Sequence, residues 1–175
     1  MLNSLEEVLP DLARQRPQEP RTIHWSTIEN RLGKLPSDYK ELAEAYPSFV
    51  VDEFLSVSIP RTGREESFCD SLLEDLQDLA QLSELDESHG YNPYPSPGGL
   101  LPVATTFSGD ILYWRTNDTN PDAWTIVVST TNDDWWQYTG TLTEFLVDWL
   151  GGTMERIGLP SEVPRRNPPV RLGKG

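Results

Sequence analysis

The sequence predicts an α+β domain, in which helices flank a run of consecutive and mainly antiparallel strands. Three observations indicate this class. Apolar residues recur at helical spacing before residue 50. Residues 100–139 contain short β-prone runs separated by turn-forming residues, which is typical of hairpins. Residues 142–150 return to helical spacing and are followed by two glycines, so we expect a closing helix there.

The part of the chain before residue 50 is expected to hold helices. Residues 2–14 carry four leucines on one helical face, and Pro10 interrupts that helix or restarts it. Residues 25–32 form a second apolar stripe that a glycine closes. Residues 37–46 form a third, which ends at Pro47.

The middle of the chain alternates between strand and helix signals. Residues 54–59 are β-prone and end at a proline, and residues 67–87 form an acidic amphipathic helix. Residues 100–107 and 110–114 flank a Ser108-Gly109 turn and predict a hairpin. Two further strands are expected within residues 124–130 and 134–140. We expect the helices to cover one face of this sheet.

The chain divides into three parts by composition. Residues 1–20 are expected to be a helical extension and a linker, and residues 21–155 a single α+β domain. Within that domain, Thr141 and Glu144 have the spacing of a capping box before the closing helix. Residues 156–175 are rich in proline and arginine without periodicity, so we expect a flexible basic tail.

The charge is concentrated in the middle of the chain. The protein has a formal net charge of -14. Residues 65–155 contain 17 acidic residues and a single lysine or arginine, Arg115. An acidic body disfavours nucleic acid and anionic membranes as direct ligands, because both require clustered basic residues. It favours a cationic protein partner, although charge also serves solubility alone.

The usual signatures of catalysis and cofactor binding are missing from the sequence. There is no glycine-rich phosphate loop, and Cys69 is the only cysteine, which excludes an internal disulfide and a cysteine-based zinc site. Cys69 lies on an apolar stripe and is expected to be a buried, unreactive thiol. His24 is expected beside a helix start and His89 in an exposed turn, far apart in sequence. We therefore expect no metal and no cofactor.

Targeting signals are also missing. No apolar run approaches the roughly 20 residues of a membrane span, and the first residues lack the pattern of a signal peptide. A cytoplasmic protein, with a monomer favoured, is the simplest expectation.

Several acidic and aromatic residues fall in or beside the expected turns and form the candidate partner-binding set. Carboxylates in turns can gather at the ends of a sheet, and a tryptophan beside them can anchor a protein contact. One alternative is that these acids are ordinary solvated turn residues, and another is that Asp133 to Trp136 form a sugar-binding site. Residues 118–129 match a calcium-binding loop only in part, so we expect a hairpin loop there. The candidates are Asp110, Asp118, Asp122, Asp133 and Asp134, with Trp114 or Trp135 as the aromatic anchor.

Two blocks of the sequence resemble a known superfamily. Residues 25–47 contain Trp-x-x-Ile-Glu-x-x-Leu-Gly followed by Leu-Pro-x-Asp-Tyr-Lys. Residues 100–152 contain Gly109-Asp110, the aromatic pair Tyr113-Trp114, Trp136 and a helix with Phe145-Leu146. In this order the motifs resemble the SUKH superfamily, which groups fungal cell-wall synthesis regulators with bacterial toxin-immunity proteins. The usual glycine after the Leu-Pro-x-x-Tyr helix is replaced by Pro47-Ser48, so that turn is expected to differ.

The resemblance implies a protein that is not an enzyme and acts by binding. For the bacterial members it implies neutralisation of a cognate toxin, often a nuclease, and an acidic inhibitor suits a cationic nuclease surface. A regulatory or scaffold module, as in the fungal members, is the first alternative. The second is an acidic DNA mimic, which would use rows of carboxylates on the helix at 67–87.

Overall fold

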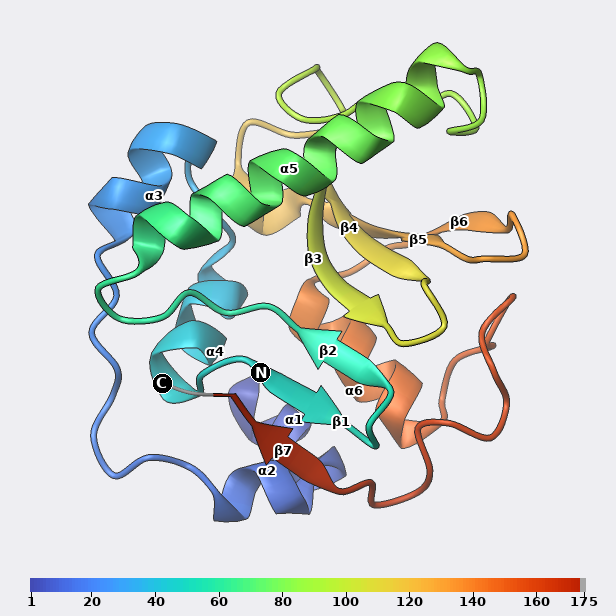
Figure 1. Ribbon diagram of the computed structural model, residues 1–175. Coiled ribbons are helices and arrows are strands. Elements are labelled where there is room, and N and C mark those ends of the chain that lie inside the picture. Colours follow the sequence, from blue (N-terminus) through green and yellow to red (C-terminus); the bar gives the residue numbers. More distant parts are fainter. Residues whose placement is uncertain (174–175) are drawn as a thin grey trace.

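The computed structural model describes residues 1–173, which form a twisted sheet flanked by helices (Figure 1). The helices are α1 Leu2–Val8, α2 Pro10–Arg14, α3 Trp25–Leu32, α4 Ser37–Ala45, α5 Glu65–Glu84 and α6 Leu142–Gly151, with a short 3-10 turn η1 at Pro121–Ala123. The strands are β1 Phe49–Val51, β2 Leu55–Val57, β3 Leu100–Thr106, β4 Ile111–Arg115, β5 Thr125–Ser129, β6 Trp135–Tyr138 and β7 Val170–Leu172.

The strands confirm the predicted α+β class. Within residues 1–173, seven strands pair in the order β6-β5-β4-β3-β2-β1-β7, and every neighbouring pair is antiparallel. Strands β1 to β6 therefore follow one another as a meander, and the predicted Ser108-Gly109 turn joins β3 to β4. The exception to this sequential order is β7, which adds to the outer edge of β1.

The main core lies on one face of the sheet. Alternation along the strands directs Leu112 and Trp114 of β4 and Ile126 of β5 toward this face, where all three are buried. Helix α6 packs there through Phe145 and Trp149, which are fully buried. The predicted capping box at the start of α6 is present, with the Thr141 hydroxyl and the Glu144 carboxylate each accepting a backbone N–H.

The opposite face is also covered, so the prediction that helices cover one face is wrong. Leu100, Tyr113 and Val127 point away from the main core and form a second buried cluster with Leu79 of α5. Figure 1 shows α5 lying across the sheet on the side opposite α6. The central strands carry large apolar side chains on both faces, and burying both faces requires a cover on each.

The N-terminal helices are part of the main core. Leu2, Leu5, Leu9 and Leu12 are almost fully buried, and α1 contacts α6. As predicted, the helical segment divides at Pro10: α1 ends at Val8 and α2 begins with the proline at its first position, where its missing N–H costs nothing.

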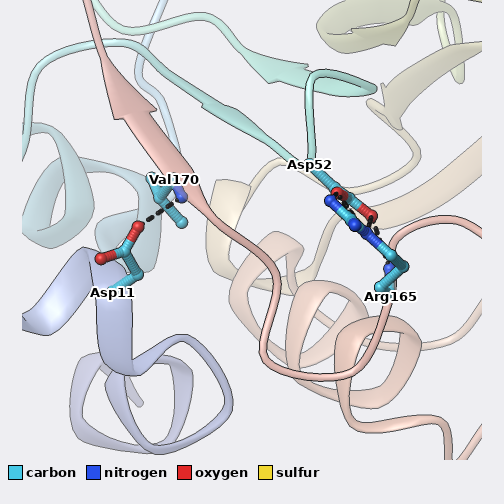
Figure 2. Close-up of polar contacts among 4 residues, drawn as sticks. All are labelled: Asp11, Asp52, Arg165 and Val170. Atoms are coloured by element: carbon cyan, nitrogen blue, oxygen red, sulfur yellow. Dashed lines mark hydrogen bonds and ion pairs between the residues drawn. The ribbon is translucent and has the colours of Figure 1, made fainter.

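The C-terminal segment is ordered where the sequence predicted a flexible tail. Val170–Leu172 forms β7, and its pairing with β1 overturns the prediction for these residues. The last two residues of the predicted tail, 174–175, lie outside the described residues. Helix α2 and its C-cap residue secure the outer edge of the strand. The Asp11 carboxylate accepts the Val170 N–H at 2.7 Å (Figure 2), and the Gln15 amide donates to the Val170 carbonyl at 2.8 Å. The cause is tertiary, since a three-residue strand has no stability of its own.

A charge pair holds the segment that leads into β7. The Asp52 carboxylate, 3% exposed, accepts the Arg165 backbone N–H at 2.7 Å and the guanidinium Nε at 2.9 Å (Figure 2). These hydrogen bonds from Arg165 lower the pKa of Asp52 from its ordinary value of 3.8. Arg171 makes an exposed ion pair with Glu53 at 3.1 Å. The basic segment and the acidic body therefore attract each other at the β1–β2 turn.

The Asp52 pair predicts a pH-dependent contribution to stability. Because the folded-state pKa of Asp52 is depressed, the carboxylate stabilises the fold at neutral pH, and this contribution is lost as the pH falls below 3.8. Asp52→Asn should therefore lower the thermal midpoint at pH 7, and its difference from wild type should shrink toward pH 2.5. Glu41→Gln, at an exposed carboxylate, serves as the control. A difference that stays constant over this range would contradict the assignment.

A second buried carboxylate joins α4 to α6. Asp38 is 5% exposed, and one of its oxygens accepts both the backbone N–H and the hydroxyl of Thr143 at 2.9 Å. Asp38→Ala leaves both donors buried without that acceptor, so we expect a loss of about 1–3 kcal/mol in the free energy of unfolding. Urea denaturation measures this loss, and Asp38→Ala combined with Thr143→Val should lose less than the two single losses added together. Strict additivity would show that the two residues are not coupled.

Candidate functional site

Three hairpin connections meet at one end of the sheet, which we call the turn end. They are the β1–β2 turn at 52–54, the β3–β4 turn at 107–110 and the β5–β6 loop at 130–134. An antiparallel meander places alternate connections at the same end. Backbone contacts join them here: the Phe107 N–H donates to the Phe54 carbonyl at 2.9 Å, and Figure 1 shows the three connections on the same side of the molecule.

Asp110 proves to be structural, which corrects its prediction as a partner contact. It is 1% exposed. One carboxylate oxygen accepts the Thr106 hydroxyl at 2.6 Å, and the other accepts the Thr131 N–H at 3.1 Å. A buried carboxylate requires such donors, and here they tie the β3–β4 turn to the β5–β6 loop.

Trp114 is likewise wrongly predicted as an anchor for a partner. Its side chain is 1% exposed and packs edge-to-face on Tyr39, with ring centroids 4.8 Å apart. The strand alternation that directs Trp114 into the main core makes it unavailable to any surface.

Asp118 and Asp122 lie at the opposite end of the sheet from Asp133, because strand β5 separates their loop from the β5–β6 loop. Both carboxylates are exposed and organise local backbone. Asp118 accepts the Asn120 N–H at 2.8 Å, and Asp122 accepts the Ser37 N–H at the start of α4 at 2.6 Å. That bond lowers the pKa of Asp122. The structure therefore does not gather the five predicted carboxylates into one site.

Asp133 and Asp134 differ in their surroundings although they are adjacent. Asp133 is exposed, and its carboxylate lies 3.1 Å from Nε2 of His89. Asp134 is half-buried beside Thr130, and Gly158 of the C-terminal segment packs against its carboxylate. A Cβ at Gly158 would clash with that carboxylate, so the chain approaches closely there. Asp133 is the more accessible of the two.

Trp135 and Trp136 face opposite sides of the sheet, as alternation predicts. Trp136 packs against Phe145 in the main core. Trp135 belongs to the second face and is half-buried, stacked near His89 and Tyr91 at centroid distances of 5.8 Å and 5.6 Å. The edge of its ring system therefore borders the surface.

A pocket of about 470 Å³ opens beside Trp135, and we call it the acidic pocket. It brings two predicted residues, Asp133 and Trp135, together with acids that sequence reasoning missed. Its size lies within the range of ligand pockets, and its carboxylates and aromatic wall suit a cationic group. The lining residues are Leu82, Asp86, Glu87, His89, Ser129, Thr130, Thr131, Asp133 and Trp135.

The negative potential of the acidic pocket is only partly compensated. Among the ion pairs of residues 1–173, none involves Asp86 or Glu87, and Asp133 has only the His89 ring. Arg115 lies outside the pocket lining, over the Tyr91 ring and bonded to Gln137. The concentration of acidic residues within 65–155 is the sequence signal that could have indicated Asp86 and Glu87. The path of the loop after α5, which brings them to Trp135, has no such local signal.

The cysteine and the two histidines lie where the sequence predicted them. Cys69 is buried, and desolvation raises the pKa of its thiol, as expected for an unreactive cysteine. His24 lies at the N-cap of α3, and His89 is in an exposed turn, in agreement with their predictions. Over residues 1–173, no group of three acidic, histidine or cysteine side chains could hold a metal ion.

Most of the chain matches a known protein family. The family model SUKH_6, described as SMI1-KNR4 cell-wall, matches residues 24–146, well over half of the 175-residue chain. The chain therefore belongs to the SMI1-KNR4 family of the SUKH superfamily, and the resemblance seen in the sequence is confirmed. Comparisons with curated proteins and with solved structures give no match. In the part of the chain that the structure describes, no helix is both long and apolar enough to cross a membrane.

The acidic pocket predicts weak binding of a single guanidinium group. Acetyl-arginine amide should shift the NMR signals of Trp135 and His89, with a dissociation constant on the order of millimolar. Acetyl-citrulline amide has nearly the same shape without the charge and should shift them far less. Glu87→Gln combined with Asp133→Asn should remove the difference between the two compounds. Equal shifts with both compounds in wild type would contradict a charge-selective pocket.

Proposed function

We propose that this protein is a cytoplasmic, non-enzymatic immunity-type protein that binds and neutralises a cationic protein toxin. The acidic pocket is the single observation that carries the proposal, because three carboxylates and a tryptophan there can receive a lysine or arginine side chain. Membership of the SMI1-KNR4 family supports a role in binding rather than in catalysis.

The electrostatics favour rapid and selective association. The acidic body attracts a cationic domain over a distance, which raises the association rate at low salt. At contact, close charge pairs that lose water can couple by roughly 1.5–7 kcal/mol. The half-buried Trp135, whose ring lies beside His89 and Tyr91, adds apolar contact area for the methylene stem of a lysine or arginine.

The charge distribution on α5 gives less support to a DNA mimic. A row of acids at i, i+4 spacing runs along the helix from Glu66 through Asp70, Glu74 and Asp78. Arg31 of α3 pairs with the first two, at 3.0 Å from Glu66 and 2.8 Å from Asp70. Because Arg31 neutralises Glu66 and Asp70, only part of the acidic row on α5 keeps its charge. We therefore favour the acidic pocket over the surface of α5 as the partner-binding site.

Reversing the charge of the acidic pocket tests the proposal. The pocket variant combines Asp86→Lys, Glu87→Lys and Asp133→Lys. A matched control, Glu7→Lys with Glu41→Lys and Glu162→Lys, changes the net charge equally at exposed acids outside that pocket. Tagged proteins are recovered from their own cells at low and high salt, and captured proteins are identified by mass spectrometry.

We expect wild type and control to capture one basic protein. The pocket variant should bind that protein at least about 30-fold more weakly, which is a loss of about 2 kcal/mol of binding free energy. The captured protein should be toxic when expressed alone and harmless with wild type. Equal capture by the pocket variant would refute the site. A captured protein that is not toxic would refute the immunity role and favour a regulatory module.

A further inference from the structure

One aromatic side chain, Phe107, is largely exposed at the turn end. Phe107 begins the β3–β4 turn, is 64% exposed, and belongs to neither buried cluster. The fold gains little from an apolar ring in this position. A single exposed apolar residue is ordinary on a protein surface, and what distinguishes Phe107 is its place on a turn that packs against the lining of the acidic pocket.

The backbone that carries Phe107 is rigidly held. The Phe107 N–H donates to the Phe54 carbonyl at 2.9 Å, which fixes the turn to the neighbouring hairpin. Within the turn, the Gly109 N–H donates to the Thr106 carbonyl at 3.0 Å, and Asp110 clamps the Thr106 hydroxyl. A ring on such a turn loses little backbone freedom on binding, so most of its burial would contribute to affinity.

The Phe107 turn is continuous with the acidic pocket. A Cβ at Gly109 would lie 3.0 Å from the Thr131 side chain, so the turn packs directly on the β5–β6 loop, and Thr131 lines the pocket. Gly158 packs on Thr130 of the same loop, and its neighbour Ile157 is 42% exposed. An apolar and acidic surface thus extends across the turn end.

We propose that Phe107 is the apolar anchor of the interface with the cationic partner and inserts into an apolar pocket rimmed by lysine or arginine. That the partner is cationic rests on the proposed function. Asp133, exposed on the β5–β6 loop against which this turn packs, supplies negative charge that matches such a rim. A buried phenylalanine contributes mainly to the lifetime of a complex, whereas surface charges contribute mainly to the rate of encounter.

In-cell photo-crosslinking tests the surface directly. Phe107 is replaced by the photoreactive p-benzoylphenylalanine, and the same replacement at Leu73, an exposed apolar residue on α5, is the control. We expect a discrete adduct at position 107, absent at 73, whose crosslinked peptide is apolar with lysine or arginine nearby. An adduct no stronger than the control, an adduct with a second copy of this chain, or one with an acidic protein would each overturn the proposal.

Binding kinetics with the crosslinked protein then separate the anchor from the charges. Phe107→Ala should weaken affinity by about 30-fold through faster dissociation, with an unchanged salt dependence and thermal midpoint. Phe107→Leu should recover most of the loss, and Leu73→Ala should change nothing. An unchanged dissociation rate in Phe107→Ala would overturn the anchor. A partner that binds in this way without being toxic would sustain the anchor and refute only the immunity role.

Discussion

The buried carboxylate of Asp110 is the constraint on which the turn end depends. It lies away from water and accepts a hydroxyl from its own hairpin and a backbone N–H from the next one. A buried charge is tolerated only with such donors, so the two hairpins must keep this arrangement for the carboxylate to remain satisfied. These bonds hold the β3–β4 turn that carries Phe107 against Thr131 of the β5–β6 loop, although Asp110 itself is buried.

The acidic pocket arises from incomplete cover of the second face. Helix α5 packs over β3 and contributes Leu79 to the small cluster, while Trp135 on the edge strand β6 remains half-buried. The loop after α5 returns over this edge and brings His89 and Tyr91 against the Trp135 ring. The same ring therefore completes a small core and borders a polar cavity, which gives the site a rigid aromatic wall.

The C-terminal segment pairs with some of the acids at the turn end and leaves others without a cationic partner. Arg165 and Arg171 neutralise Asp52 and Glu53 at the β1–β2 turn, and this pairing serves the fold. In the described part of the chain, no guanidinium forms an ion pair with the acids of the pocket. The net charge of the chain alone does not distinguish these groups, but only carboxylates without a cationic partner are ready to bind one.

The sequence by itself determined helices α1 to α6 and strands β2 to β6 in their order, because periodicity, prolines and capping residues act locally, but it did not predict β1. The split at Pro10, the hairpin at Ser108-Gly109 and the capping box at Thr141 and Glu144 could all be read from it. Tertiary structure alone decided which turn carboxylates were buried, that β7 joined the sheet, and that His89 met Asp133 across 44 positions. The physical reason is that an aspartate in a turn has the same local pattern whether it is solvated or buried. Its state depends on donors that only long-range packing brings within hydrogen-bond distance.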